Sequence, residues 1–115
     1  MTPQHIPVRE AAQTALAYYK RGHLGAQASV GAACVYRYRY GLPYRCAIGA
    51  SLTDETLATI LKQRRNSNRV GILIDKGIIT TDDPIALADL QDAHDRWGQG
   101  GLEQAFLTIA KELAE

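Results

Sequence analysis

Cys46 and His94 are the residues whose types could support covalent catalysis in this sequence. A thiolate beside an imidazole can attack an acyl carbon, and a nearby carboxylate can hold the imidazole in the required tautomer. Asp92 and Asp95 lie close to His94 in the sequence and are the candidates for that carboxylate. One hypothesis is therefore a Cys–His hydrolase, with Cys46, His94 and Asp95 as its candidate catalytic residues.

The expected positions of these residues argue against catalysis. Cys46 falls on the apolar side of an expected strand, where burial disfavours the reactive thiolate. No sequence signature of a known cysteine-hydrolase family surrounds it. His94 falls between Leu90 and Trp97 on the apolar side of an expected helix, where a hydrogen-bonded core histidine is more common than a ligand or a pH switch. We therefore expect a protein that is not an enzyme.

The histidines and cysteines also lack the spacing of a metal site. His5, His23 and His94 are far apart, and two cysteines are too few for a four-thiolate zinc site. We expect neither a metal nor a cofactor. In the expected hairpin, Cys34 lies at least about 7 Å along the strand from the position opposite Cys46. A disulfide needs Cα atoms roughly 5.5–6 Å apart, so we predict two reduced thiols that pack as small apolar side chains.

Six arginines are candidates for a binding surface, because they lie in an expected hairpin or in the basic, amide-rich run 62–69: Arg37, Arg39, Arg45, Arg64, Arg65 and Arg69. Arginines on a ribbon could hold phosphates while neighbouring tyrosines stack on bases. Arginine and tyrosine are also the residues that protein interfaces favour. The formal net charge is only +1, whereas a dedicated nucleic-acid-binding domain is usually strongly basic. A protein partner is therefore the first expectation and nucleic acid the alternative.

The charges are unevenly distributed along the chain. Residues 1–76 hold 11 Lys and Arg against 4 Asp and Glu, whereas residues 77–115 hold 2 against 8. Such a chain can present one basic and one acidic face, or the two parts can pack together and neutralise each other. The sequence leaves both arrangements open.

Several segments have the apolar spacing of three and four residues that is typical of amphipathic helices. Pro84 suits a first helical turn, and Gly77 suits the position just after a helix. A strand over 70–74 is the alternative for the third segment. The expected helices cover residues 7–21, 54–65, 68–76, from Pro84 to the glycines at 98–101, and 102–114.

One segment has the strict alternation of a β-strand. Cys34, Tyr36, Tyr38 and Tyr40 share one face of residues 32–40. Residues 41–43 form a turn, and residues 44–48 return as a second strand. We therefore expect an α+β fold: a single, mostly helical domain over residues 1–115, with one two-stranded antiparallel β-hairpin packed against four to five helices.

We expect this domain to lie in the cytoplasm. No stretch approaches the roughly 20 apolar residues of a membrane span, and the N-terminal residues lack the basic and apolar regions of a signal peptide. We expect no membrane association. The oligomeric state is left open, with a homodimer among the alternatives.

Three short motifs resemble a family of small uncharacterised phage and prophage proteins. The motifs are C-x-Y-R at residues 34–37, R-C-A-hydrophobic-G at 45–49, and L-Q-x-x-H-D at 90–95 with a following tryptophan. The resemblance implies a phage or prophage origin in a bacterial host cell. It also marks Arg37, Gln91, His94 and Asp95 as polar motif residues, which could form a structural network that joins the hairpin to a helix.

Taken together, these features predict a non-catalytic binding protein that acts on a host or phage macromolecule. Small phage proteins often bind host proteins, so inhibition of a bacterial defence system, in the manner of an anti-CRISPR, or of a regulatory system is one form of this prediction. The first alternative is a nucleic-acid-binding accessory protein that uses the hairpin arginines and the run 62–69. The second alternative is the Cys–His hydrolase.

Overall fold

The computed structural model describes residues 2–22, 29–30, 33–34, 47–61, 70–98 and 103–115. These residues form five α-helices, one 3₁₀ turn and two small pairs of strands. The helices are α1 (Val8–Lys20), α2 (Asp54–Leu61), α3 (Val70–Asp75), α4 (Pro84–Gly98) and α5 (Glu103–Ala114), and the 3₁₀ turn is η2 (Gly49–Ser51). The prediction of a mostly helical fold is confirmed.

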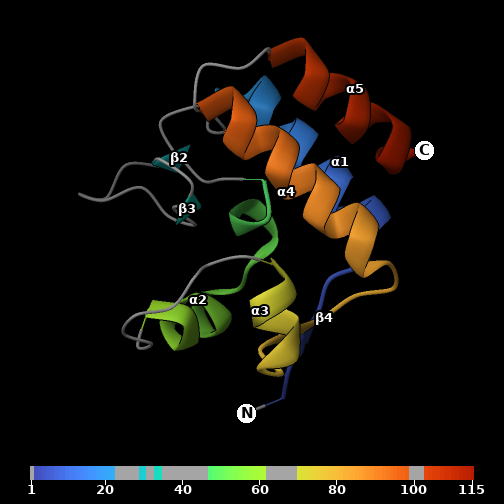
Figure 1. The fold of residues 1–115 in the computed structure, drawn as a ribbon. Helices are drawn as coiled ribbons and strands as arrows, with labels where there is room; N and C mark the ends of the chain where they lie inside the picture. Colours follow the sequence, from blue (N-terminus) through green and yellow to red (C-terminus); the bar gives the residue numbers. More distant parts are fainter. Residues whose placement is uncertain (1, 23–28, 31–32, 35–46, 62–69, 99–102) are drawn as a thin grey trace.

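Helices α1, α4 and α5 pack side by side and carry much of the core (Figure 1). Ala11, Ala12 and Ala15 of α1 have no exposed surface, and these small side chains allow the neighbouring helices to approach closely. Phe106 and Ala110 of α5 are also fully buried. The three helices thus form one wall of the molecule, and α4 is in position to present side chains to its centre.

The ends of α3 and α4 show the capping interactions that make helix ends predictable from sequence. The backbone N–H of Ile78 donates to the Leu73 carbonyl at 3.0 Å, and the N–H of Gly77 donates to the Ile74 carbonyl at 2.9 Å. Gly77 has a φ of 71°, which is the left-handed cap that the glycine predicts. At the start of α4, Asp83 Oδ1 accepts the N–H of Ala86 at 3.1 Å.

A parallel pair of strands joins the N-terminal segment to the segment after α3, and this corrects the expectation of a single antiparallel hairpin. Strand β1 (Gln4–His5) pairs with β4 (Ile79–Thr80), with Gln4 opposite Ile79. The Ile6 N–H donates to the Thr80 carbonyl at 2.8 Å. Ile6 and Ile79 are buried in the core, so the pairing is held by apolar burial on both segments.

The described part of the predicted hairpin also pairs differently. Strand β3 (Ala33–Cys34) is antiparallel to β2 (Ser29–Val30), which precedes it, whereas the prediction paired residues 32–40 with residues 44–48. Residues 47–48 form a turn that leads into η2 and not a strand. The physical reason is that the Ile48 N–H donates to a helix side chain and its carbonyl accepts from Ser51, so neither group is available for a strand ladder. The rest of the predicted hairpin, residues 35–46, lies outside the described residues.

Within the described ranges, no helix is long and apolar enough to cross a membrane.

Candidate functional site

Three of the four polar motif residues lie together on α4. Gln91, His94 and Asp95 are spaced three and four residues apart, which places them on one face of the helix. Gln91 is 2 % exposed and His94 has no exposed surface, whereas the Asp95 side chain keeps 15 %. Arg37, the fourth motif residue, lies outside the described residues.

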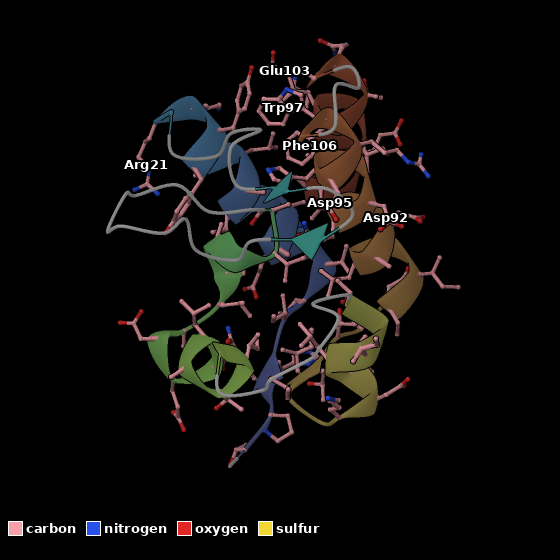
Figure 2. The ribbon with its side chains drawn as sticks, turned by 60° about the vertical axis from the view of Figure 1, so that its left-hand side comes forward. Arg21, Asp92, Asp95, Trp97, Glu103 and Phe106 are labelled. Atoms are coloured by element: carbon pink, nitrogen blue, oxygen red, sulfur yellow. The ribbon has the colours of Figure 1, made fainter. Side chains whose placement is uncertain are left out.

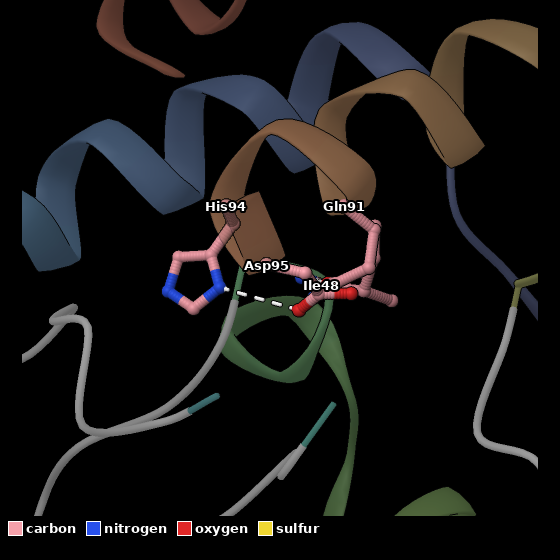
Figure 3. A network of polar contacts seen from close by, with 4 residues as sticks. All are labelled: Ile48, Gln91, His94 and Asp95. Atoms are coloured by element: carbon pink, nitrogen blue, oxygen red, sulfur yellow. Dashed lines mark hydrogen bonds and ion pairs between the residues drawn. The ribbon is translucent and has the colours of Figure 1, made fainter. Parts of the chain in front are cut away.

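Gln91 is the centre of the network that these residues form (Figure 3). Its Oε1 accepts the backbone N–H of Ile48 at 2.8 Å, and its Nε2 donates to Asp95 Oδ1 at 2.9 Å. The same Asp95 oxygen lies 3.8 Å from His94 Nδ1, which is too long for a hydrogen bond but close enough for electrostatic attraction. Since both ends of the amide are used, Gln91 holds α4 against the segment that enters η2.

Aromatic rings surround the His94 imidazole. Its ring makes edge contacts with Trp97 and Phe106, with ring centroids 5.7 Å apart in each case. Trp97 and Phe106 stack on each other at 5.8 Å and 20°, and Figure 2 shows these two side chains together near Glu103. The imidazole is therefore part of an aromatic cluster between α4 and α5.

Tyr19 of α1 extends this cluster toward the surface. Its ring lies 6.1 Å from the Trp97 ring, and its hydroxyl donates to the Glu103 carboxylate. The hydrogen bond and negative charge of Glu103, together with partial burial, raise the pKa of Tyr19 above its ordinary value. Tyr19 thereby joins α1 to the start of α5, which closes the outer side of the cluster.

The chemistry open to this arrangement is limited by the burial of His94. A general base must come within hydrogen-bond reach of the proton that it removes. An imidazole with no exposed surface does not reach a dissolved substrate in this conformation. The arrangement instead satisfies buried polar groups and fixes the position of α4, which is the ordinary role of a buried polar network.

The remaining predicted site residues are not brought together with this network in the described structure. Asp92 is exposed and points outward from α4, whereas Asp95 lies on the side toward the core (Figure 2). Cys46 and all six candidate arginines fall outside the described residues, and so does the Cys34 side chain. The predictions for the thiols and the basic surface therefore stay predictions.

Two hollows at the surface were not found by sequence reasoning. One is a groove of about 280 Å³ between α4 and α5. The other is a cleft of about 480 Å³ beside β1 and the start of α1. Ser51 lines this cleft, and its buried hydroxyl has no hydrogen-bond partner within the described part of the chain. Neither hollow has a sequence signature, because each is lined by residues from elements that only the fold brings together.

No group of three or more histidine, cysteine, aspartate or glutamate side chains among the described residues could hold a metal ion. No family model, curated protein or solved structure matches the chain.

Proposed function

We propose that this chain is a non-catalytic binding protein of phage or prophage type, and that it acts on a protein of the bacterial host. The observation that supports this proposal most is the enclosure of His94. The one histidine in the motif set has no exposed surface and lies against Trp97, Phe106 and Asp95. A residue in this position stabilises the fold and is poorly placed to transfer protons to a substrate.

The other described motif residues favour the same interpretation. Gln91 uses its amide to bind the Ile48 backbone and Asp95. Because the motif residues on α4 make their contacts inside the molecule, recognition of another macromolecule falls to side chains at the surface. The resemblance to small phage proteins favours a host protein as that macromolecule, for example a component of a defence or regulatory system. A protein of this kind acts by covering part of its target.

The proposal can be tested by capture of the target. The tagged chain is incubated with bacterial lysate, and a captured protein is then purified separately and mixed with the chain. We expect a complex of fixed stoichiometry in size-exclusion chromatography with light scattering. Failure to reconstitute a complex with any captured protein would contradict the proposal.

The two alternatives give different outcomes in parallel measurements. A gel shift that weakens steeply with salt and disappears when Arg37, Arg39 and Arg45 are replaced by alanine would favour nucleic-acid binding. Rapid reaction of Cys46 with a thiol reagent in the folded chain would favour the hydrolase. We expect neither result.

A further inference from the structure

The groove between α4 and α5 combines an apolar floor with an acidic rim. Its floor includes Ala93, which is 6 % exposed, and the half-buried Ile109 and Leu113. Its rim carries three exposed carboxylates: Asp89, Asp92 and Glu112. A concave apolar surface with charges at its edge is the usual form of a groove that receives an amphipathic helix.

The charges of the rim are not balanced within the groove. Arg96 is the one cation that lines it, against the three carboxylates. Within the described part of the chain, none of these four side chains forms an ion pair with another residue. The rim therefore keeps a net negative charge that attracts cations and repels phosphates.

An exposed apolar side chain continues the groove at the start of α4. Ile85 is 75 % exposed and is the large apolar residue that stands out at the described surface. The spacing of Ile85, Asp89, Asp92 and Arg96 is four, three and four residues, which places them along one stripe of the helix. An apolar contact is thus available beside the carboxylates, where a partner helix could bury it.

We propose that this groove docks a basic amphipathic helix of the partner protein. Apolar side chains of that helix, three and four residues apart, would cover Ile109, Leu113 and Ile85, while flanking lysines or arginines would meet Asp89, Asp92 and Glu112. The charge of the rim selects this occupant, because it disfavours nucleic acid and acidic protein segments. The inference rests on the proposed function and adds the chemistry of the partner to it.

A synthetic peptide provides the probe. The fluorescein-labelled peptide has about 18 residues, with leucine at three- and four-residue spacing and lysine elsewhere, long enough to form a helix when bound. A second peptide has the same composition with its leucines scattered. Fluorescence anisotropy against the full chain should show tighter binding of the amphipathic peptide, and the affinity should fall as salt is raised.

Two groove variants and one control locate the binding. The triple variant D89N/D92N/E112Q should weaken peptide binding about tenfold. Ile85→Ser should weaken it several-fold and is not expected to disturb the core, because Ile85 is exposed. The control E10Q/E55Q/D75N removes the same number of charges at exposed positions outside the groove, and it should bind as the unchanged chain does. Circular dichroism confirms that each variant is folded.

Four results would overturn the inference. Equal weakening of peptide binding by the control and by the groove triple variant would mean non-specific charge attraction. Equal binding of both peptides would mean that the chain does not recognise the apolar face of the amphipathic peptide. Self-association of the chain that disappears in the groove variants would identify a second copy as the occupant. A captured host protein that binds D89N/D92N/E112Q unchanged would remove the groove inference and leave the proposed function intact.

Discussion

Gln91 shows how one side chain can satisfy two different buried groups. The Ile48 N–H needs an acceptor, and Asp95 needs a donor. A side-chain amide supplies both, whereas a glutamate in the same place would set a second carboxylate beside Asp95 and would repel it. The residue type at position 91 is therefore determined by its two neighbours.

Replacement of Gln91 by leucine should destabilise the fold, because it leaves the Ile48 N–H without its acceptor. A buried donor that loses its partner costs about 1–3 kcal/mol. We expect a loss of this size in the free energy of unfolding, measured by urea denaturation. Gln104→Leu is the matched control, since Gln104 lies exposed on α5, and it should change the stability by no more than about 0.5 kcal/mol. Equal stability of the two variants would show that the network contributes nothing.

At this scale, the family resemblance marked Gln91, His94 and Asp95 as candidates for a structural network, and their spacing of three and four residues fits one side of a helix. The sequence did not predict what encloses them. The contact of His94 with Phe106 depends on how α5 packs across α4. No spacing within one helix contains that information.

The start of α1 and the end of α3 are each capped by a residue that lies outside the helix. Helix α1 begins after Pro7, whose side chain makes no cap hydrogen bond. Asp82, from the loop before α4, accepts the Val8 N–H through its Oδ1 at 2.9 Å and so supplies the missing cap. Helix α3 ends at Gly77 in the left-handed conformation. The Asp82 cap joins two segments that are far apart in the sequence, whereas the Gly77 cap is local.

The Asp82 cap should make stability depend on pH in the acid range. The hydrogen bond from Val8 lowers the pKa of Asp82 below its ordinary value, and weaker hydrogen bonds and the charge of His5 act in the same direction. A lowered folded-state pKa means that the ionised cap stabilises the fold above the ordinary aspartate pKa of about 4, and that this contribution is lost as the pH falls through the folded-state pKa. Asp82→Ala should therefore be less stable than the unchanged chain at neutral pH, with a difference that shrinks below about pH 4. Thermal unfolding across the pH range measures this.

Asp75→Ala is the control for the Asp82 cap. Asp75 is exposed at the end of α3, and its replacement should leave the dependence of stability on acid pH unchanged. A pH profile of Asp82→Ala that runs parallel to that of the unchanged chain would contradict the cap.

Two glycines of the same region should respond to alanine in opposite ways. Gly77 has a φ of 71°, which an alanine adopts at a cost of about 1 kcal/mol or more. Gly71 lies within α3 with open space around it, so Gly71→Ala should stabilise the fold by up to about 1 kcal/mol. Chemical denaturation of the two variants tests the sign of each change. Destabilisation by both would mean that the cap geometry is not the cause.

The helices were predictable from sequence because their signals are local, whereas the strands were not. Pro84, Gly77 and the apolar stripes mark helix positions within a few residues of themselves. Strands β1 and β4 have two residues each, which is too short for any alternation to be visible. Their pairing is decided by the burial of Ile6 and Ile79 in a common core, a long-range effect. The predicted strand over 44–48 is wrong at residues 47–48 for the same reason, since the Ile48 N–H donates to Gln91 from a distant helix.

Over the whole molecule, the described structure separates an interior that uses the polar motif residues from a surface that carries charge. The aromatic cluster around His94 joins α1, α4 and α5. The exposed carboxylates of Asp89, Asp92 and Glu112 instead lie around the groove that contains Ile109. This separation is compatible with the proposal that the protein acts through contacts made by its surface.

Titration of the purified host partner with the chain distinguishes binding without catalysis from enzymatic action. After incubation with amounts of chain well below equimolar, intact-mass spectrometry of the partner should show no change in mass, and the amount of complex should rise in proportion to the chain added until a fixed ratio is reached. The Cys46→Ser variant should give the same titration curve. A change in the mass of the partner at these low amounts, absent with Cys46→Ser, would contradict the claim and identify the chain as an enzyme.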